Sequence, residues 1–345
     1  MSKTKMIGLL SATLLTGAAM GGVVDATGSG EWMTVYPTIT DADTALVGLN
    51  KTVTAADGTT DTVAGIILRG GGAGSVLNIN AGSSITVGAS QIKAGSNNNT
   101  KGYLNINGGS LSSSSDLLLG GNGANVYGEL NVNSGSYSST ANLVLGGTTY
   151  DSGPAGVANL SGGSVDVVNW QVGGAGAGLL NVSGGTHTGT ADLMDGASGG
   201  QVLISGGELA INRVLLDGAT GVSISGGKLV ITGTNNNRLD LSGGAGLNIS
   251  DAGVLQWNFG NKWQDGSTVD LLIGSGEITF DAGENSIMLY ADFDNSWTDG
   301  DGDILYAKSD GGSTYFWVAI PEPATLGLIS AFGGGMLFIR RRFLI

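Results

Sequence analysis

A short apolar segment that ends in glycine recurs along this chain and constrains the fold more than any other feature. The clearest copy reads Gly102-Tyr-Leu-Asn-Ile-Asn-Gly-Gly-Ser-Leu111. The last glycines of the successive copies are Gly82, Gly109, Gly135, Gly163, Gly185, Gly207, Gly227 and Gly253. These glycines are 27, 26, 28, 22, 22, 20 and 26 residues apart. A repeat of this length, in which no single unit can bury its own apolar side, predicts a solenoid of about eight stacked coils.

Each copy has the alternation of a β-strand. Leu104 and Ile106 lie two residues apart, so in an extended strand both face one way while Asn105 faces the other. A second apolar run, such as Leu117-Leu-Leu-Gly-Gly121, follows the glycine turns, so each coil should hold at least two strands with glycine corners. In a helix, each glycine would cost about 1 kcal/mol relative to alanine. The pattern therefore predicts an all-β chain that forms a parallel β-solenoid, expected to be a right-handed β-helix.

The composition excludes several classes of protein. The formal net charge is −14, whereas a nucleic-acid binder needs a basic surface. The chain has no cysteine and one histidine, so it has neither disulfide bonds nor the ligands of a zinc site. An acidic, disulfide-free body is compatible with an exported protein that is stabilised by stacked backbone hydrogen bonds.

The N-terminal residues predict export. Residues 1–26 begin with Lys3 and Lys5, continue with an apolar run of about thirteen residues and end in Val24-Asp-Ala26, a small-x-small cleavage site. This order is typical of a secretory signal peptide that signal peptidase removes, and the run is short for a membrane span. Residues 27–65 predict an N-terminal cap, in which a strand-like segment with Trp32 and Tyr36 covers the first coil. The coils are predicted to occupy residues 66–253.

The outward asparagines are one candidate site in the coils. They are Asn78, Asn105, Asn131, Asn181 and Asn248. In stacked coils these side chains should form a ladder on one face. Hydrogen bonding between stacked amides favours a structural role. A glycan-binding stripe is the alternative.

Asp195 and Asp217 are a second candidate site. We align both with the first glycine of the glycine corner, so successive coils should place the two carboxylates roughly 5 Å apart. Such a separation suits the acidic pair of a retaining polysaccharide hydrolase. The alternative is a corner role, because aspartate tolerates turn conformations. No constellation of arginine, lysine and aspartate recurs beside the pair, which favours the corner role.

Residues 254–318 change in composition and predict a capping β-region. Four of the six tryptophans lie there, in alternating runs that suit the closed end of a solenoid. Within this region Asp299, Asp301 and Asp303 alternate as in a calcium loop, but Ile304 occupies the position that an EF-hand gives to glycine. An EF-hand is therefore excluded. A looser calcium site and a solvated acidic turn are the two remaining interpretations, and calcium is the only cofactor predicted.

The C-terminus carries the most specific motif. Pro321, Glu322 and Pro323 precede an apolar segment at residues 324–339, and Arg340, Arg341 and Arg342 follow it. The apolar segment is marginal for a membrane helix, and the basic cluster would hold its end on the cytoplasmic side. Residues 320–345 closely resemble the PEP-CTERM sorting signal of exported bacterial proteins, with Ile320 where valine often stands. The resemblance implies a membrane-anchored precursor that an exosortase, a membrane-embedded cysteine transpeptidase, recognises and processes.

The resemblance also implies a place at the cell surface and an association with extracellular polysaccharide. The repeats separately resemble the β-helix repeats of autotransporters. We therefore expect an exported, non-enzymatic surface or matrix protein whose partners are signal peptidase, exosortase and exopolysaccharide. Contact with the membrane is expected through the C-terminal helix before processing, and no nucleic acid is expected as a partner. A β-helix carbohydrate-active enzyme is the alternative, and a concave acidic groove would distinguish it.

Overall fold

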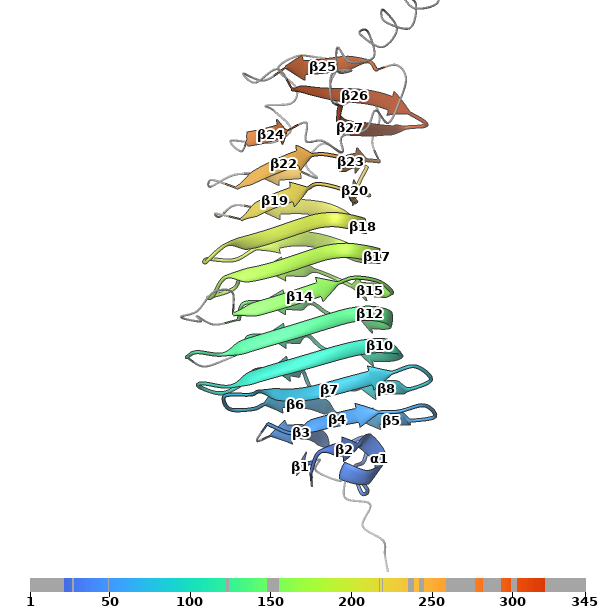
Figure 1. Cartoon of the computed structure of the whole chain (residues 1–345), viewed down its shortest axis with the longest axis vertical. Coiled ribbons are helices and arrows are strands. Elements are labelled where there is room, and N and C mark those ends of the chain that lie inside the picture. Colours follow the sequence, from blue (N-terminus) through green and yellow to red (C-terminus); the bar gives the residue numbers. More distant parts are fainter. Residues whose placement is uncertain are drawn as a thin grey trace, which may run out of the picture.

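The structure is a computed structural model of the whole chain. It describes residues 22–319 except 27, 49, 122–123, 148–154, 217, 219, 235–238, 242–244, 259–276, 282–292 and 299–302. These residues form a β-solenoid of about nine turns, and the described part contains one helix of four residues. Figure 1 shows the coils stacked along one axis, from β3 near the N-terminal end to β22. The predicted parallel β-solenoid is confirmed.

Each turn contributes strands to three faces of the solenoid. Within a coil the chain passes through face 1, then face 2, then face 3, and continues into face 1 of the next coil. Face 1 contains β2 (Gly30–Glu31), β4 (Thr52–Ala55), β7 (Ser75–Asn80), β14 (Gly156–Leu160), β19 (Gly221–Ile224), β22 (Gly246–Ser250) and β24 (Glu277–Asp281). Face 2 contains β5 (Thr60–Val63), β8 (Ser84–Val87), β15 (Ser164–Val167), β20 (Lys228–Ile231) and β23 (Val254–Trp257). Face 3 contains β1 (Val23–Asp25), β3 (Thr44–Gly48), β6 (Gly65–Arg69), β9 (Ile92–Ala94), β11 (Leu117–Leu119), β13 (Leu143–Leu145), β16 (Trp170–Val172) and β21 (Leu239–Leu241).

Four longer strands pass from one face to the next without a break. β10 (Lys101–Ser113) and β12 (Tyr127–Ser139) each supply faces 1 and 2, as their pairings with β7 and β8 and with β14 and β15 show. β17 (Gly178–Asp195) and β18 (Gly200–Leu216) each contribute to all three faces. The described strands of successive coils pair in parallel, and the register shifts only at irregularities such as those after Ile106 and Val182.

The stacking places like residues above like inside the solenoid. Leu104 pairs in register with Leu77 below and Leu130 above, and Ile106 lies between Ile79 and Val132 in the same way. All of these side chains are fully buried. Continuous aliphatic columns follow from the period-two pattern of the sequence, because alternate residues of a strand share one face. The core is therefore one narrow column rather than a globular centre.

Glycine corners separate the faces, as the sequence predicts. Gly120 and Gly146 follow equivalent strands of face 3 and have φ angles of 70° and 80°. A Cβ atom at Gly146 would lie 2.2 Å from the carbonyl oxygen of Gly176. Both the left-handed conformation and the close approach of the next coil require glycine here.

The N-terminal end differs from the expected cap. Parallel pairing begins before residue 66, because β3, β4 and β5 pair with β6, β7 and β8. The segment expected to be strand-like instead forms the short helix α1 (Trp32–Val35), which lies at the N-terminal end of the stack in Figure 1. Trp32 and Tyr36 are buried with ring centroids 4.8 Å apart, and Trp32 Nε1 donates to Asp61 Oδ2 at 2.7 Å. The aromatic pair is thus buried at the end of the stack, as expected, but on a helical turn.

The predicted signal peptide lies almost entirely outside the described residues. Its last part, β1, pairs with β3 in parallel, and the Ala26 N–H donates to the Leu46 carbonyl at 2.9 Å. Cleavage after Ala26 would remove β1 from the edge of face 3.

The C-terminal end changes from parallel to antiparallel pairing. β27 (Ser313–Ala319) pairs antiparallel with β23, and β26 (Ile304–Asp310) and β25 (Asn295–Thr298) continue the unit. Trp257 and Trp317 are buried in this region, while Trp263 lies outside the described residues. The antiparallel unit occupies the end of the stack opposite α1 (Figure 1).

Residues 320–345 lie outside the described residues, and with them the predicted sorting motif and its helix. Among the residues that the structure does describe, no helix is long and apolar enough to span a bilayer.

Candidate functional site

The outward asparagines of face 1 form a continuous hydrogen-bonded column, which we call the amide ladder. Its members are Asn78, Asn105, Asn131, Asn159 and Asn181. Each Nδ2 donates to the Oδ1 of the asparagine one coil below, at distances of 2.8–2.9 Å, and Asn78 Nδ2 donates to Thr54 Oγ1 at 3.3 Å. All the amides therefore point their donors in the same direction along the axis. These side-chain hydrogen bonds link five successive coils, which favours the structural interpretation of the asparagines.

The ladder differs from the prediction at two positions. It includes Asn159, which stands between Ala158 and Leu160 in its copy of the repeat and was not among the predicted asparagines. Asn248 does not join it, because Leu203 and Ser223 occupy the two intervening coils at the same register. The ladder thus ends at Asn181.

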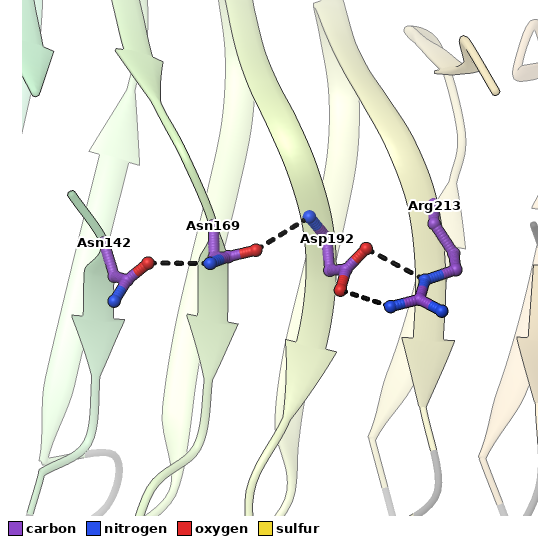
Figure 2. A network of polar contacts seen from close by, with 4 residues as sticks. All are labelled: Asn142, Asn169, Asp192 and Arg213. Atoms are coloured by element: carbon purple, nitrogen blue, oxygen red, sulfur yellow. Dashed lines mark hydrogen bonds and ion pairs between the residues drawn. The ribbon is translucent and has the colours of Figure 1, made fainter. Parts of the chain in front are cut away.

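A second polar column, which we call the polar seam, runs along the corner between faces 2 and 3 (Figure 2). Asn169 Nδ2 donates to Asn142 Oδ1 at 2.8 Å, and the Asp192 N–H donates to Asn169 Oδ1 at 2.9 Å. Arg213 closes the seam with two bonds to the Asp192 carboxylate, at 2.9 and 2.6 Å. These bonds, together with the nearby charges of Asp192 and Asp240, raise the pKa of Arg213 against the opposing effect of burial. The seam therefore ties four coils together and ends in a bidentate ion pair.

The seam was not predicted, although the sequence carries a signal for it. Asn142 and Asn169 each stand one residue before the apolar run of face 3, as Asp116 does one coil earlier. Asp116 Oδ1 accepts the Asn142 N–H at 3.0 Å, so the same position is polar in consecutive coils. Aligning the repeats on these positions would have revealed the column.

A hydroxyl-lined groove lies on face 2 and its following corner. It encloses about 590 Å³ between serine and threonine side chains of successive coils, including Thr86, Ser112, Ser138 and Thr190. Of the residues that the structure describes, Asp166 is the only charged one that lines it, and its carboxylate accepts a hydrogen bond from the Thr188 hydroxyl at 2.5 Å. A groove with one carboxylate differs from the concave acidic cluster that polysaccharide hydrolysis requires.

The single histidine is part of the core. His187 is fully buried, with Val165 below it and Leu209 above it in the inward column of face 2. Its Nε2 lies 2.8 Å from the Gly184 carbonyl oxygen, and Nδ1 has no hydrogen-bond partner among the described residues. Burial lowers the pKa of His187, against the smaller opposing effects of the Gly184 carbonyl and the Asp166 carboxylate. A neutral imidazole enclosed in this way cannot exchange protons with a ligand on the surface.

Asp195 does not occupy the corner position that the alignment of the repeats suggested. The register pairs it with Val172 of the coil below rather than with Gly173, and its φ is not among the positive ones. Its Oδ2 accepts the Gly218 N–H of the next coil at 2.8 Å. Asp217 lies outside the described residues, so the predicted acidic pair stays a prediction. Asp195 itself stabilises the stacking of two coils.

The predicted calcium ligands fall mostly outside the described residues. Asp299 and Asp301 are not described, and Asp303 lies directly before β26. Within the described part of the chain, no three histidine, cysteine or acidic side chains lie close enough to hold a metal ion. The calcium site therefore stays a prediction.

Comparison with known proteins adds no assignment. No protein-family model matches the chain, and neither the curated proteins nor the solved structures include a significant match.

Proposed function

We propose that this protein is an exported, non-enzymatic structural component of the cell surface or extracellular matrix. The observation that carries the proposal is the amide ladder, in which the outward side chains of five coils bond to one another. A polysaccharide hydrolase needs two carboxyl groups that flank the scissile bond. Here three described carboxylates of the middle coils, Asp116, Asp192 and Asp195, accept hydrogen bonds that join one coil to the next.

The proposal includes the finer architecture expected from the sequence. The coils are right-handed, residues 254–318 form a C-terminal β cap, and residues 324–339 form a transient membrane helix. Pro321, Glu322 and Pro323 are the motif that exosortase recognises, and Arg340, Arg341 and Arg342 hold the helix end in the cytoplasm. Signal peptidase removes the N-terminal segment, and exosortase then removes or transfers the C-terminal one. The mature rod associates with extracellular polysaccharide.

The intact mass of protein from the producing cell tests the sorting part of this proposal. Protein from cells with an active exosortase should lack the residues after Pro321-Glu-Pro323, and protein from cells without the enzyme should retain them. Recovery of chains that end at Ile345 in both strains would overturn the processing claim.

Incubation with extracellular polysaccharides tests the structural part. We expect no release of reducing ends or unsaturated products. If products do appear and Asp195→Asn or Asp217→Asn abolishes them, the protein is a carbohydrate-active enzyme instead.

A further inference from the structure

A polar pocket on face 3, near the N-terminal end of the solenoid, has chemistry that the structural role does not use. We call it the corner pocket, because the loop after β6 and the loop after β9 enclose it where face 3 meets face 1. It has a volume of about 470 Å³, within the range of about 300–1,000 Å³ that small-molecule sites occupy. Its lining residues are Asp25, Leu46, Gly48, Arg69, Gly71, Asn97, Asn98 and Thr100.

The charges in the corner pocket do not cancel. Asp25 already forms an ion pair with Lys51 Nζ at 3.2 Å. Arg69 forms no ion pair with any described carboxylate, and its one hydrogen-bond partner in the described part of the chain is the Asn97 side-chain oxygen, at 3.0 Å from Nη1. The other N–H groups of the guanidinium remain as donors. An uncompensated arginine in a concave site favours a carboxylate, because its planar fork matches the two oxygens.

The remaining groups suit the hydroxyls of a sugar ring. Asn98 Oδ1 accepts the Ala124 N–H at 2.8 Å, which leaves Nδ2 as a donor. Asp25 keeps acceptor capacity on its second oxygen. Across β3, Asp25 stands opposite Ile67, two residues before Arg69, so the backbones of Asp25 and Arg69 are roughly 12 Å apart. A hexuronate has its carboxylate on one side of the ring and hydroxyls on the other, and it would use both ends of such a site.

The space between the two charged residues depends on a residue without a side chain. Gly48 pairs in register with Arg69, and a Cβ atom there would lie 3.5 Å from Asp25 Oδ1. Its backbone φ is not in the left-handed region, so the conformation itself does not require glycine. A larger side chain at this position would fit the strand and fill the pocket.

We propose that the corner pocket binds a carboxylate-bearing saccharide, with Arg69 holding the carboxylate and Asn98 holding a ring hydroxyl. The inference rests on the proposed function, in which the partner is a polysaccharide, and it specifies an acidic one. Cleavage after Ala26 would remove Asp25, but the carboxylate-binding half of the pocket does not depend on it. Processing of the C-terminus is independent of the pocket, so a failure here leaves the intact-mass test unaffected.

Isothermal titration calorimetry of the full-length chain tests this proposal, with tetragalacturonate as the acidic probe and tetragalactose as its neutral counterpart. We expect saturable binding of tetragalacturonate, at least tenfold tighter than binding of tetragalactose. Arg69→Gln should weaken it at least tenfold, because the guanidinium is lost. Gly48→Leu should weaken it to a similar extent without a change in charge.

Lys93→Gln is the matched control, because Lys93 lies outward on the same face and does not line the pocket. It should change the affinity less than threefold. If Arg69→Gln and Lys93→Gln weakened the binding of tetragalacturonate equally, the loss would reflect the overall charge of the protein, and the proposal would be overturned. So would the absence of saturable binding, full affinity in Gly48→Leu, or inorganic phosphate that binds as tightly as tetragalacturonate.

Discussion

The coils from β7 to β17 and the coils from β18 to β22 share one core but differ on their outer surface. Inward residues such as Ile106 in the first group and Ile224 in the second are equally buried. On the outside of face 1, the first group carries the amide ladder, whereas Leu203 and Ser223 interrupt the same position in the second. Face 2 changes as well, from serine and threonine to the ion pair of Lys228 with Glu208 at 2.7 Å.

This difference separates what stacks the coils from what reinforces them. The coils remain in register where the ladder is absent, so the aliphatic columns and the backbone hydrogen bonds suffice for stacking. Each bond of the ladder adds a net contribution of about 0.5–1.5 kcal/mol. The exposed pair of Lys228 and Glu208 adds little, since solvent screens such pairs.

The largest expected effect comes from a charge placed in the shared core. Ile106→Asp and Ile224→Asp should each lower the free energy of unfolding by about 3–5 kcal/mol, because both bury an unpaired carboxylate. Chemical denaturation followed by circular dichroism measures this. Ser112→Asp, which puts the same charge on the outside of β10, should change stability by about 0.5 kcal/mol or less. A tolerated Ile224→Asp would show that the upper coils do not share the core of the lower ones.

The second effect concerns pH and the buried His187. Burial holds its folded-state pKa below the unfolded value, so below about pH 6.5 the unfolded chain binds a proton that the folded chain does not. Stability should fall with decreasing pH in that range, by at most about 1.4 kcal/mol per pH unit for one proton.

Comparison of the wild type with His187→Leu isolates this effect from the titration of carboxylates. The difference in melting temperature between the two proteins should be constant above pH 7 and should change progressively below it. A difference that stays constant down to pH 5 would contradict the buried, neutral histidine.

The third prediction compares the same outward position of face 1 in the two groups of coils. Asn131→Ala removes one bond to Asn105 and one from Asn159, and should destabilise the solenoid by about 1–2 kcal/mol. Ser223→Ala, at the equivalent position in the upper coils, should change stability by less than about 0.5 kcal/mol. Equal effects of the two substitutions would show that the ladder contributes nothing beyond an ordinary surface residue.

The smallest effect is a gain. Leu203 is 38% exposed and lies directly above Asn181, whose Oδ1 accepts no hydrogen bond from a described residue. Leu203→Asn should extend the amide ladder by one coil and stabilise the protein by about 0.5–1 kcal/mol. Leu203→Ser, which is polar but too short to reach across the coil spacing, serves as the control. A loss of stability in Leu203→Asn equal to that in Leu203→Ser would contradict the proposed extension.

The solenoid follows from the sequence pattern alone. Period-two alternation, as in Leu104 and Ile106, and the regular return of glycine leave few other ways to bury the apolar side chains. The sequence also indicated a ladder of asparagines, because an outward residue that recurs once per coil must stack on its own copies. These features depend on local pattern and on a short repeat, both of which can be read without coordinates.

The points at which each column begins and ends depend on how the coils stack in three dimensions. The exact register places Asp195 over Val172 rather than Gly173, stops the ladder at Asn181 and brings Arg213 to Asp192. Coils of unequal length shift the positions that face one another, so counting along the chain misaligns residues that follow an insertion. The corner pocket likewise combines residues from β1, β3, β6 and the loop after β9. Such contacts depend on how successive coils are placed, because residues far apart in the chain become neighbours only when the coils stack.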